Sequence, residues 1–117
     1  MKISTIKDLL AADVLCGEEF LDREVYSACG SDMMSDVLAY VKDQAVLLTG
    51  LVNPQVSRTA EMMALVCVVF VRSKTPTEEM IELARESNMV LLKSQKRMYE
   101  ACGKLYANGL NPHGEVK

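Results

Sequence analysis

The chain has 117 residues, half of them apolar, and its formal net charge is -3. This length favours a single domain with a modest hydrophobic core. The sequence contains no Trp and only two Phe. Because proteins that bind nucleic acid rely on excess cations and on stacking aromatic rings, we expect no nucleic-acid partner.

The N-terminal sequence MKISTIKDLLAAD has no apolar stretch of the length that a signal peptide needs. The longest apolar run, Ala64–Val71, fits a buried strand and is far too short to span a bilayer. We therefore expect a cytoplasmic protein without membrane contact.

The four cysteines show no CxxC pairing, and the one histidine, His113, lies in a polar C-terminal segment. A disulfide framework needs an oxidising compartment, and zinc sites show closer ligand spacing. We therefore predict reduced, buried thiols, no metal and no cofactor. Cys29 stands apart because it ends a predicted strand before a helix, and a helix N-terminus lowers a thiol pKa.

The first third of the chain is predicted to form a helix and two strands. Ile3–Ala12 has apolar residues at helical spacing, and Thr5 is placed to cap it. Val14–Cys16 and Val25–Cys29 are short apolar strands, each followed by a glycine, with a charged connector between them.

A second helix is predicted to begin at a cap residue, Ser31 or Asp32, and to run to about Lys42. A methionine-bearing stripe on it forms either part of the core or a surface for another subunit, since Met adapts to both. The stripe consists of Met33, Met34, Val37, Leu38 and Val41.

The unit Val46–Arg58, VLLTGLVNPQVSR, is predicted to organise the fold. The run Ala45–Leu48 lacks polar alternation, which is typical of a strand covered on both faces. A Thr-Gly turn follows it. Asn53 is a good N-cap for a helix that has Pro54 at its first position and runs to about Ala64.

The second half repeats this strand-to-helix pattern. Leu65–Val71, LVCVVFV, is the most apolar and β-branched segment and should be the central strand. Thr75–Glu78 has the form of a capping box with proline at the first helical position, for a helix to about Ser87. Met89–Leu92 is predicted as a further strand, and a last helix should follow it to about Tyr106.

Strands that alternate with helices over short loops predict βαβ units. The predicted fold class is therefore α/β, with three α/β/α layers and a mainly parallel sheet of four to five strands. Residues 1–107 should form this single domain. Residues 108–117, which are polar and rich in turn residues, should form a flexible tail.

In an open parallel sheet, ligands bind outside the carboxyl ends of the strands, here termed the carboxyl edge. The residues predicted there carry hydroxyls, cations or helix caps, which favour an anion such as phosphate. Ordinary helix capping selects the same residue types, so both interpretations stay open. The candidate ligand-binding residues are Cys29, Gly30, Ser31, Asp32, Thr49, Gly50, Asn53, Arg72, Ser73, Lys93 and Ser94. The candidate interface residues are Met33, Met34, Val37, Leu51 and Val52.

The motifs of common enzyme classes are missing from the sequence. It contains no GxxxxGKS/T, no GxGxxG and no GxSxG. With one histidine, Ser-His or Cys-His catalysis is not expected. The basic run Lys93–Arg97, KSQKR, is typical of a solvated helix start. We predict that the protein is not an enzyme; the alternative is a small enzyme that uses Cys29, Asp32 or Thr49.

Three stretches together resemble the DRTGG domain family. They are Asp22-Arg23 within FLDREV, the segment ACGSDMMSDVLAYVK, and LLTGLVNPQVSRTAEM. They occur in the order typical of the family, and the resemblance spans about residues 3–107. One departure is that Leu51 follows Thr49-Gly50, where the family name implies a second glycine.

DRTGG domains are similar to the N-terminal domain of HPr kinase/phosphorylase and, more distantly, to a nucleotide-sugar-binding domain of Mur ligases. They accompany CBS-domain pairs in regulatory proteins and a phosphate acetyltransferase domain in longer chains. The family has no established activity of its own. The resemblance therefore implies an HPr kinase N-terminal-domain-like fold and a regulatory or interaction module that is commonly a dimer.

The residues and the resemblance together favour a non-catalytic regulatory module. We expect it to form a homodimer and to sense a small anionic ligand, a nucleotide or another phosphate-bearing molecule, at the carboxyl edge. The alternative is an accessory subunit that binds a metabolic or redox enzyme as its protein partner, without any ligand.

Overall fold

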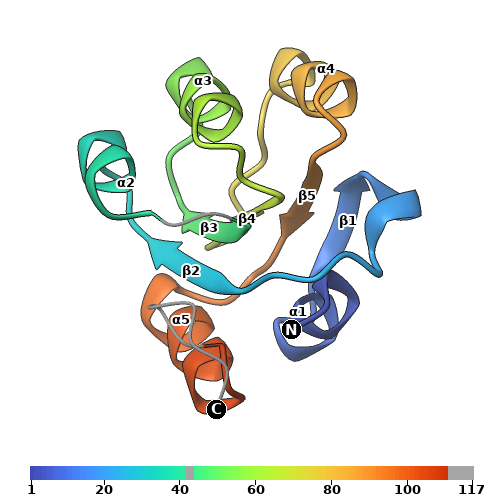
Figure 1. The fold of residues 1–117 in the computed structure, drawn as a ribbon, viewed down its shortest axis with the longest axis vertical. Helices are drawn as coiled ribbons and strands as arrows, with labels where there is room; N and C mark the ends of the chain where they lie inside the picture. Colours follow the sequence, from blue (N-terminus) through green and yellow to red (C-terminus); the bar gives the residue numbers. More distant parts are fainter. Residues whose placement is uncertain (42–43, 111–117) are drawn as a thin grey trace.

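The computed structural model describes residues 1–41 and 44–110, which form a five-stranded sheet between layers of helices (Figure 1). The strand order is β1-β5-β4-β3-β2. Neighbours from β5 to β2 run parallel, and β1 pairs antiparallel with β5. The predicted fold class is confirmed. The strands are β1 (Asp13–Cys16), β2 (Ser27–Gly30), β3 (Ala45–Thr49), β4 (Cys67–Phe70) and β5 (Val90–Lys93).

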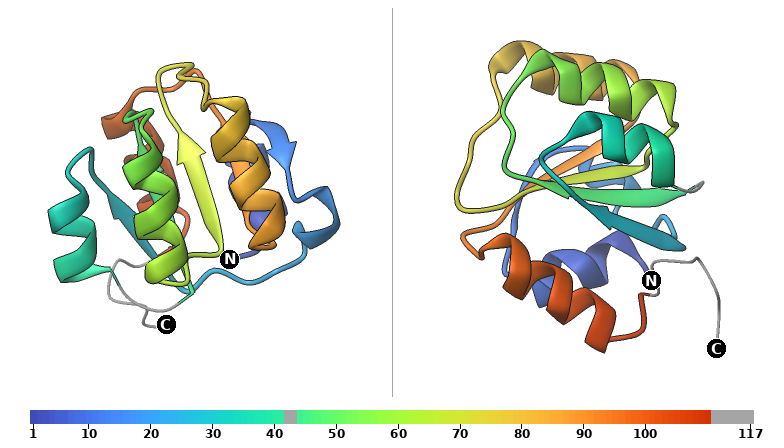
Figure 2. Two further views of the ribbon diagram at one scale, coloured as in Figure 1. Left: turned by 90° about the horizontal axis from the view of Figure 1, so that it is seen from above. Right: turned by 90° about the vertical axis from the view of Figure 1, so that its left-hand side faces the viewer.

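The helices cover both faces of the sheet (Figures 1 and 2). One face carries α2 (Met34–Tyr40), α3 (Pro54–Met62) and α4 (Glu78–Glu86). The other carries α1 (Ile3–Leu9) and α5 (Met98–Ala107), and a short 3-10 helix, Glu18–Phe20, follows β1. No helix in the described ranges is both long and apolar enough to cross a bilayer.

The middle of the sheet is apolar on both faces. Every residue of β3 and β4 is buried, and β4 lies at the centre of the strand order. The buried side chains form two clusters, one on each face of the sheet. The prediction of a doubly covered third strand and a central fourth strand is therefore confirmed.

The first helix begins and ends differently from the prediction. Thr5 does not cap α1, because Lys2 stands at the N-cap position, where its backbone pairs with Glu24. The helix ends at Leu9, earlier than predicted, because the next turn is broken by Ala11 at a left-handed φ of 49°.

The predicted caps of α2 are also wrong. Neither Ser31 nor Asp32 occupies the N-cap position, which belongs to Met33 and has no side-chain hydrogen bond. The Ser31 hydroxyl accepts a hydrogen bond from the Met33 N–H (2.9 Å), and Asp32 turns towards β3. The helix ends at Tyr40, and the predicted end at Lys42 lies outside the described residues.

Only part of the apolar stripe on this helix packs into the core. Met34 and Val37 are buried and Val41 is half-buried. Met33 and Leu38 are instead 61% and 44% exposed. The stripe thus divides into a core half and a surface half.

The cap of α4 was predicted too early in the chain. Thr77 caps this helix, since its hydroxyl accepts a hydrogen bond from the Met80 N–H (3.2 Å). Pro76 therefore precedes the helix and does not occupy its first position. The N-cap of α3 is as predicted: Asn53 accepts a hydrogen bond from the Gln55 N–H (2.8 Å).

The C-terminal helix begins at Met98, after a loop that the prediction assigned to its first turn. Beyond the helix, Leu110 is only 3% exposed and packs in the cluster on the α1–α5 face. Residues 111–117, which hold His113 and most of the predicted tail, lie outside the described part of the chain.

Two buried serines give a matched test of the packing. The Ser94 hydroxyl donates to the Leu10 carbonyl (2.8 Å), whereas the Ser27 hydroxyl has no partner among the described residues. We expect Ser94→Ala to lower the free energy of unfolding by about 1–3 kcal/mol, because it leaves buried polar groups unpaired. Ser27→Ala should leave it unchanged or raise it. Urea denaturation measures both, and equal losses in the two variants would contradict this account.

Candidate functional site

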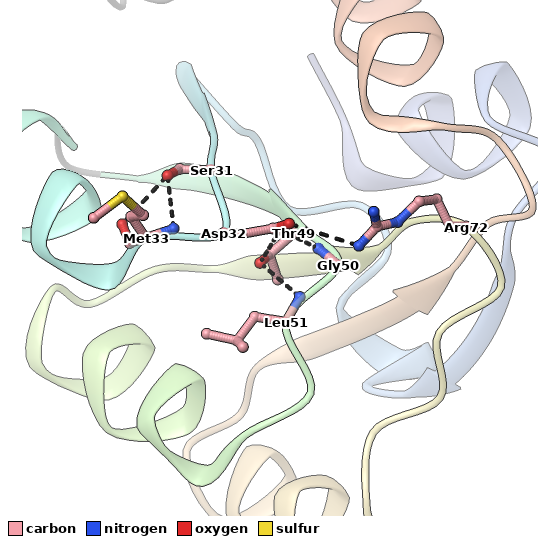
Figure 3. A network of polar contacts seen from close by, with 7 residues as sticks. All are labelled: Ser31, Asp32, Met33, Thr49, Gly50, Leu51 and Arg72. Carbon is pink, nitrogen blue, oxygen red and sulfur yellow. Dashed lines mark hydrogen bonds and ion pairs between the residues drawn. The ribbon is translucent and has the colours of Figure 1, made fainter.

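The loops after β2, β3 and β4 meet at the carboxyl edge, where a polar network joins them (Figure 3). Because these strands are parallel neighbours, their carboxyl ends lie side by side. We term this group the strand-end network. It consists of Asp32, Thr49, Gly50, Leu51 and Arg72.

The Asp32 carboxylate is the acceptor at the centre of the network. Its Oδ1 atom accepts hydrogen bonds from the Gly50 N–H (2.7 Å) and from the Thr49 hydroxyl (3.1 Å). Its Oδ2 atom lies 3.6 Å from Nη2 of Arg72. One carboxylate thus ties the loop after β2 to the ends of β3 and β4.

The Thr49 hydroxyl has a partner on each side. It donates to Asp32 and accepts a hydrogen bond from the Leu51 N–H (3.1 Å). Thr49 is completely buried, so a hydroxyl without these partners would be costly there. This explains why a polar residue is tolerated at the end of an otherwise apolar strand.

Gly50 makes room for the arginine. A Cβ atom at this position would lie 2.8 Å from Cζ of Arg72 and would clash with Nη2. The guanidinium therefore lies directly against the backbone of Gly50. Any larger residue would push it away from Asp32.

A left-handed turn directs Arg72 towards the network. Arg72 and Ser73 have φ angles of 57° and 56°, and the Lys74 N–H donates to the Val71 carbonyl (3.1 Å) across the turn. Non-glycine residues lose about 1–2 kcal/mol each in this conformation. The Arg72 N–H donates to the Lys96 carbonyl (2.8 Å), a contact that holds the turn in place.

The ion pair of the network is weak. The side chains of Asp32 and Arg72 are each 47% exposed, so water screens their attraction. Such pairs contribute at most about 1 kcal/mol. The two hydrogen bonds to Asp32, and not the ion pair, hold its position.

Further cations lie at the same edge. Lys74 follows the turn after β4, Lys93 ends β5, and Lys96 and Arg97 occupy the loop before α5. Of these, Lys96 is 3.6 Å from Glu100. The sequence did not indicate Lys96 or Arg97 as site residues, because KSQKR was assigned to a helix start; the density of cations was the available signal.

The predicted ligand-binding residues fall into two groups. Asp32, Thr49, Gly50 and Arg72 come together in the strand-end network, and Ser73 and Lys93 lie beside it on the same edge. The other five make contacts elsewhere. Cys29 packs against the cluster under α2, α3 and α4, and Gly30 lies under Cys102. Ser31 contacts Met33, Asn53 caps α3, and Ser94 is buried against Leu10.

The predicted interface residues also differ in exposure. Met34 and Val37 are buried in the core of this chain. Leu51 and Val52 are half-buried and pack against the cluster under α2, α3 and α4. Of this set only Met33 is largely exposed.

The Cys29 thiol, which the sequence singled out because it precedes a helix, does not have a lowered pKa. Burial raises the pKa of the Cys29 thiol above its ordinary value, and the nearby Asp36 carboxylate raises the pKa further. Burial also raises the pKa of Cys16, Cys67 and Cys102. All four cysteines are free, as predicted. Residues 1–41 and 44–110 contain no group of three or more side chains placed to hold a metal ion.

Alkylation tests whether the pKa of the Cys29 thiol is raised. A raised pKa means that less thiolate is present at any given pH, so the rate at Cys29 should keep rising above about pH 8.5, where a free thiol is half ionised. Iodoacetamide labelling resolved by peptide mass spectrometry gives the pH profile, with a short cysteine peptide as the control. A midpoint below that of the peptide would show an activated thiol and contradict the assignment.

These features define a small, three-layer α/β domain with a polar network at its carboxyl edge. No family model and no curated protein matches the sequence. Among solved structures, the fold is similar to the CBS and DRTGG domains of the regulatory region of Clostridium perfringens pyrophosphatase, a crystal structure in complex with the activator diadenosine tetraphosphate. The TM-score is 0.73 at 18% sequence identity, over 89% of this chain and 45% of that chain. The chain therefore has a DRTGG-like fold, as its resemblance predicts.

Proposed function

We propose that the chain is a non-catalytic regulatory module that senses a small phosphate-bearing ligand at the strand-end network and self-associates. One observation supports the part of this proposal that concerns the ligand. Donors from two loops, the Thr49 hydroxyl, the Gly50 N–H and the Arg72 guanidinium, converge on one anionic group at the carboxyl edge. Such convergence is typical of anion recognition.

The solved neighbour supports a regulatory role. It belongs to the regulatory region of an enzyme and was crystallised with a nucleotide activator. A shared fold does not by itself transfer the ligand, so the nucleotide enters here only as the first candidate class.

The chemistry of the described residues supports a non-catalytic role. Residues 1–41 and 44–110 contain no histidine that could act as a base, since His113 lies outside them. The thiol of Cys29 has a raised pKa, which disfavours the nucleophilic thiolate. The Thr49 hydroxyl is buried and already donates to Asp32.

A thermal-shift panel of nucleotides, acyl phosphates and nucleotide sugars tests the ligand half. We expect at least one compound to raise the melting temperature, and Arg72→Gln to weaken its binding by about ten-fold or more, since a charge-assisted hydrogen bond is lost. Arg85→Gln is the matched control, because Arg85 pairs with Glu82 on α4. No shift with any compound, or equal weakening in both variants, would contradict the ligand half.

The self-association half is proposed from the exposed apolar side chains around α2. Met33 and Tyr40, seven residues apart, are 61% and 76% exposed. Residues at this spacing lie on the same side of a helix. The helix α2 lies at the outer end of the layer that it forms with α3 and α4 (Figure 2). We propose that this side of α2 forms the contact between two copies.

Sedimentation velocity tests this contact with two matched variants. Met33→Lys/Tyr40→Lys should convert a dimer to a monomer at micromolar concentration, because it places like charges at the contact. Tyr99→Lys/Tyr106→Lys carries the same spacing and added charge on α5, where both tyrosines are exposed, and should leave the dimer intact. A monomeric wild-type protein, or dissociation of both variants alike, would reject the α2 contact.

A further inference from the structure

The acceptor at the centre of the strand-end network belongs to the chain itself. Asp32 supplies the oxygens that the Gly50 N–H, the Thr49 hydroxyl and the Arg72 guanidinium contact. A hydroxyl, a backbone N–H and a guanidinium are also the donors that bind phosphate oxygens. The carboxylate thus stands where the oxygens of a bound phosphate would lie.

We propose that Asp32 is an internal occupant of a phosphate site, and that a phosphate group binds by displacing its carboxylate from Thr49, Gly50 and Arg72. This inference deepens the proposed function and rests on it for its biological meaning. It names the chemical group recognised and the step that controls its entry. The ligand class is a terminal phosphate, either free or as a monoester.

The geometry makes this exchange feasible. The Asp32 side chain is 47% exposed, so a ligand reaches the carboxylate from solvent without opening the core. Its ion pair with Arg72 is long, at 3.6 Å, and partly screened by water. Gly50 has no side chain to separate its N–H from the guanidinium, so a phosphate in place of the carboxylate would contact both donors.

The surrounding charges favour the incoming group over the carboxylate. A phosphate carries more negative charge and more acceptor oxygens than one carboxylate. Lys74, Lys93 and Arg97 lie on the same edge, and the only acidic member of the strand-end network is Asp32 itself. Displacement of Asp32 therefore removes the one group in the network that repels an anion.

The exchange also connects the ligand to α2. Asp32 directly precedes Met33, which stands at the N-cap of α2 without a side-chain hydrogen bond. When Asp32 leaves Gly50, the loop that positions this helix loses its side-chain contact with the end of β3 and keeps the backbone hydrogen bond from the Ser31 N–H to the Leu48 carbonyl (3.0 Å). Because Met33 belongs to the proposed contact between copies, phosphate binding and self-association are linked, and each alters the equilibrium of the other.

Phosphate titration of four variants of the full chain tests the proposal. Inorganic phosphate and pyrophosphate are the probes, with isothermal titration calorimetry for affinity and the Gly50 amide resonance for location. Asp32→Ala empties the site, and Asp32→Asn removes the charge but keeps a side chain in place. Asp36→Ala removes one exposed carboxylate from the first turn of α2 without emptying the site. Asp32→Ala/Arg72→Gln removes the main cation.

The expected order of affinity separates displacement from simple charge effects. Asp32→Ala should bind phosphate about ten-fold or more tightly than the wild type, with a shift of the Gly50 amide, and Asp32→Asn should gain less. Asp36→Ala should stay within about two-fold of the wild type, and the double variant should lose the gain. Equal gains in Asp32→Ala and Asp36→Ala, or no gain in a folded Asp32→Ala protein, would overturn the proposal.

One further variant and a comparison with the nucleotide panel keep the test decisive. If Asp32→Ala does not fold, Asp32→Ser provides a short side chain that retains a polar group for the loop, and the same gain is expected. Failure of the wild-type nucleotide panel together with tight phosphate binding by Asp32→Ala would reject the proposed ligand sensing but uphold the displaceable carboxylate. Binding in the wild-type panel without any gain in the variant would do the reverse.

Discussion

The hydrogen bond from the Gly50 N–H to the Asp32 carboxylate is the contact on which the carboxyl edge depends. At 2.7 Å it joins the loop after β2 to the end of β3, and the buried Thr49 hydroxyl donates to the same oxygen. Arg72 then lies against Gly50, from a left-handed turn held by the loop after β5. Without the carboxylate, two donors would lose their acceptor and Arg72 its counter-charge. The carboxyl ends of three strands, β2, β3 and β4, are thus organised around one side chain.

The sequence left open whether the polar residues at the carboxyl edge cap helices or bind an anion, and the contacts of these residues bear on that question. Helix capping accounts for Asn53 and for Thr77, whose side chains bond the first turns of their helices. It does not account for Asp32, which leaves its own helix uncapped and bonds a neighbouring strand. A residue that makes a long-range contact in place of a favourable local one, such as a helix cap, is expected at a functional or strained site. The same reasoning applies to Arg72, whose backbone conformation is unfavourable without its tertiary contacts.

Local sequence rules predict the layers of this fold but not the network. The apolar runs AVLL and LVCVVFV have no polar alternation, so their burial on both faces and the central place of β4 followed from the sequence. The bounds of the helices were less predictable. Local rules predict that Ser31 or Asp32 caps α2, yet Asp32 accepts a hydrogen bond from a residue eighteen positions away. The left-handed φ of Arg72 was not predictable either, since neither Arg nor Ser favours it and contacts with residues 94 and 96 impose it. In both cases a long-range contact overrides a local preference.

Hydrogen exchange at the Gly50 amide tests the central claim most directly, because this proton makes the contact to Asp32. In the wild-type protein the amide should exchange slowly, and in a folded Asp32→Ala variant about ten-fold or more faster. The amide of Val69, in the middle of β4, should be protected equally in both proteins. Rapid exchange of the Gly50 amide in the wild type, or the same protection in the variant, would contradict the account that Asp32 organises this edge.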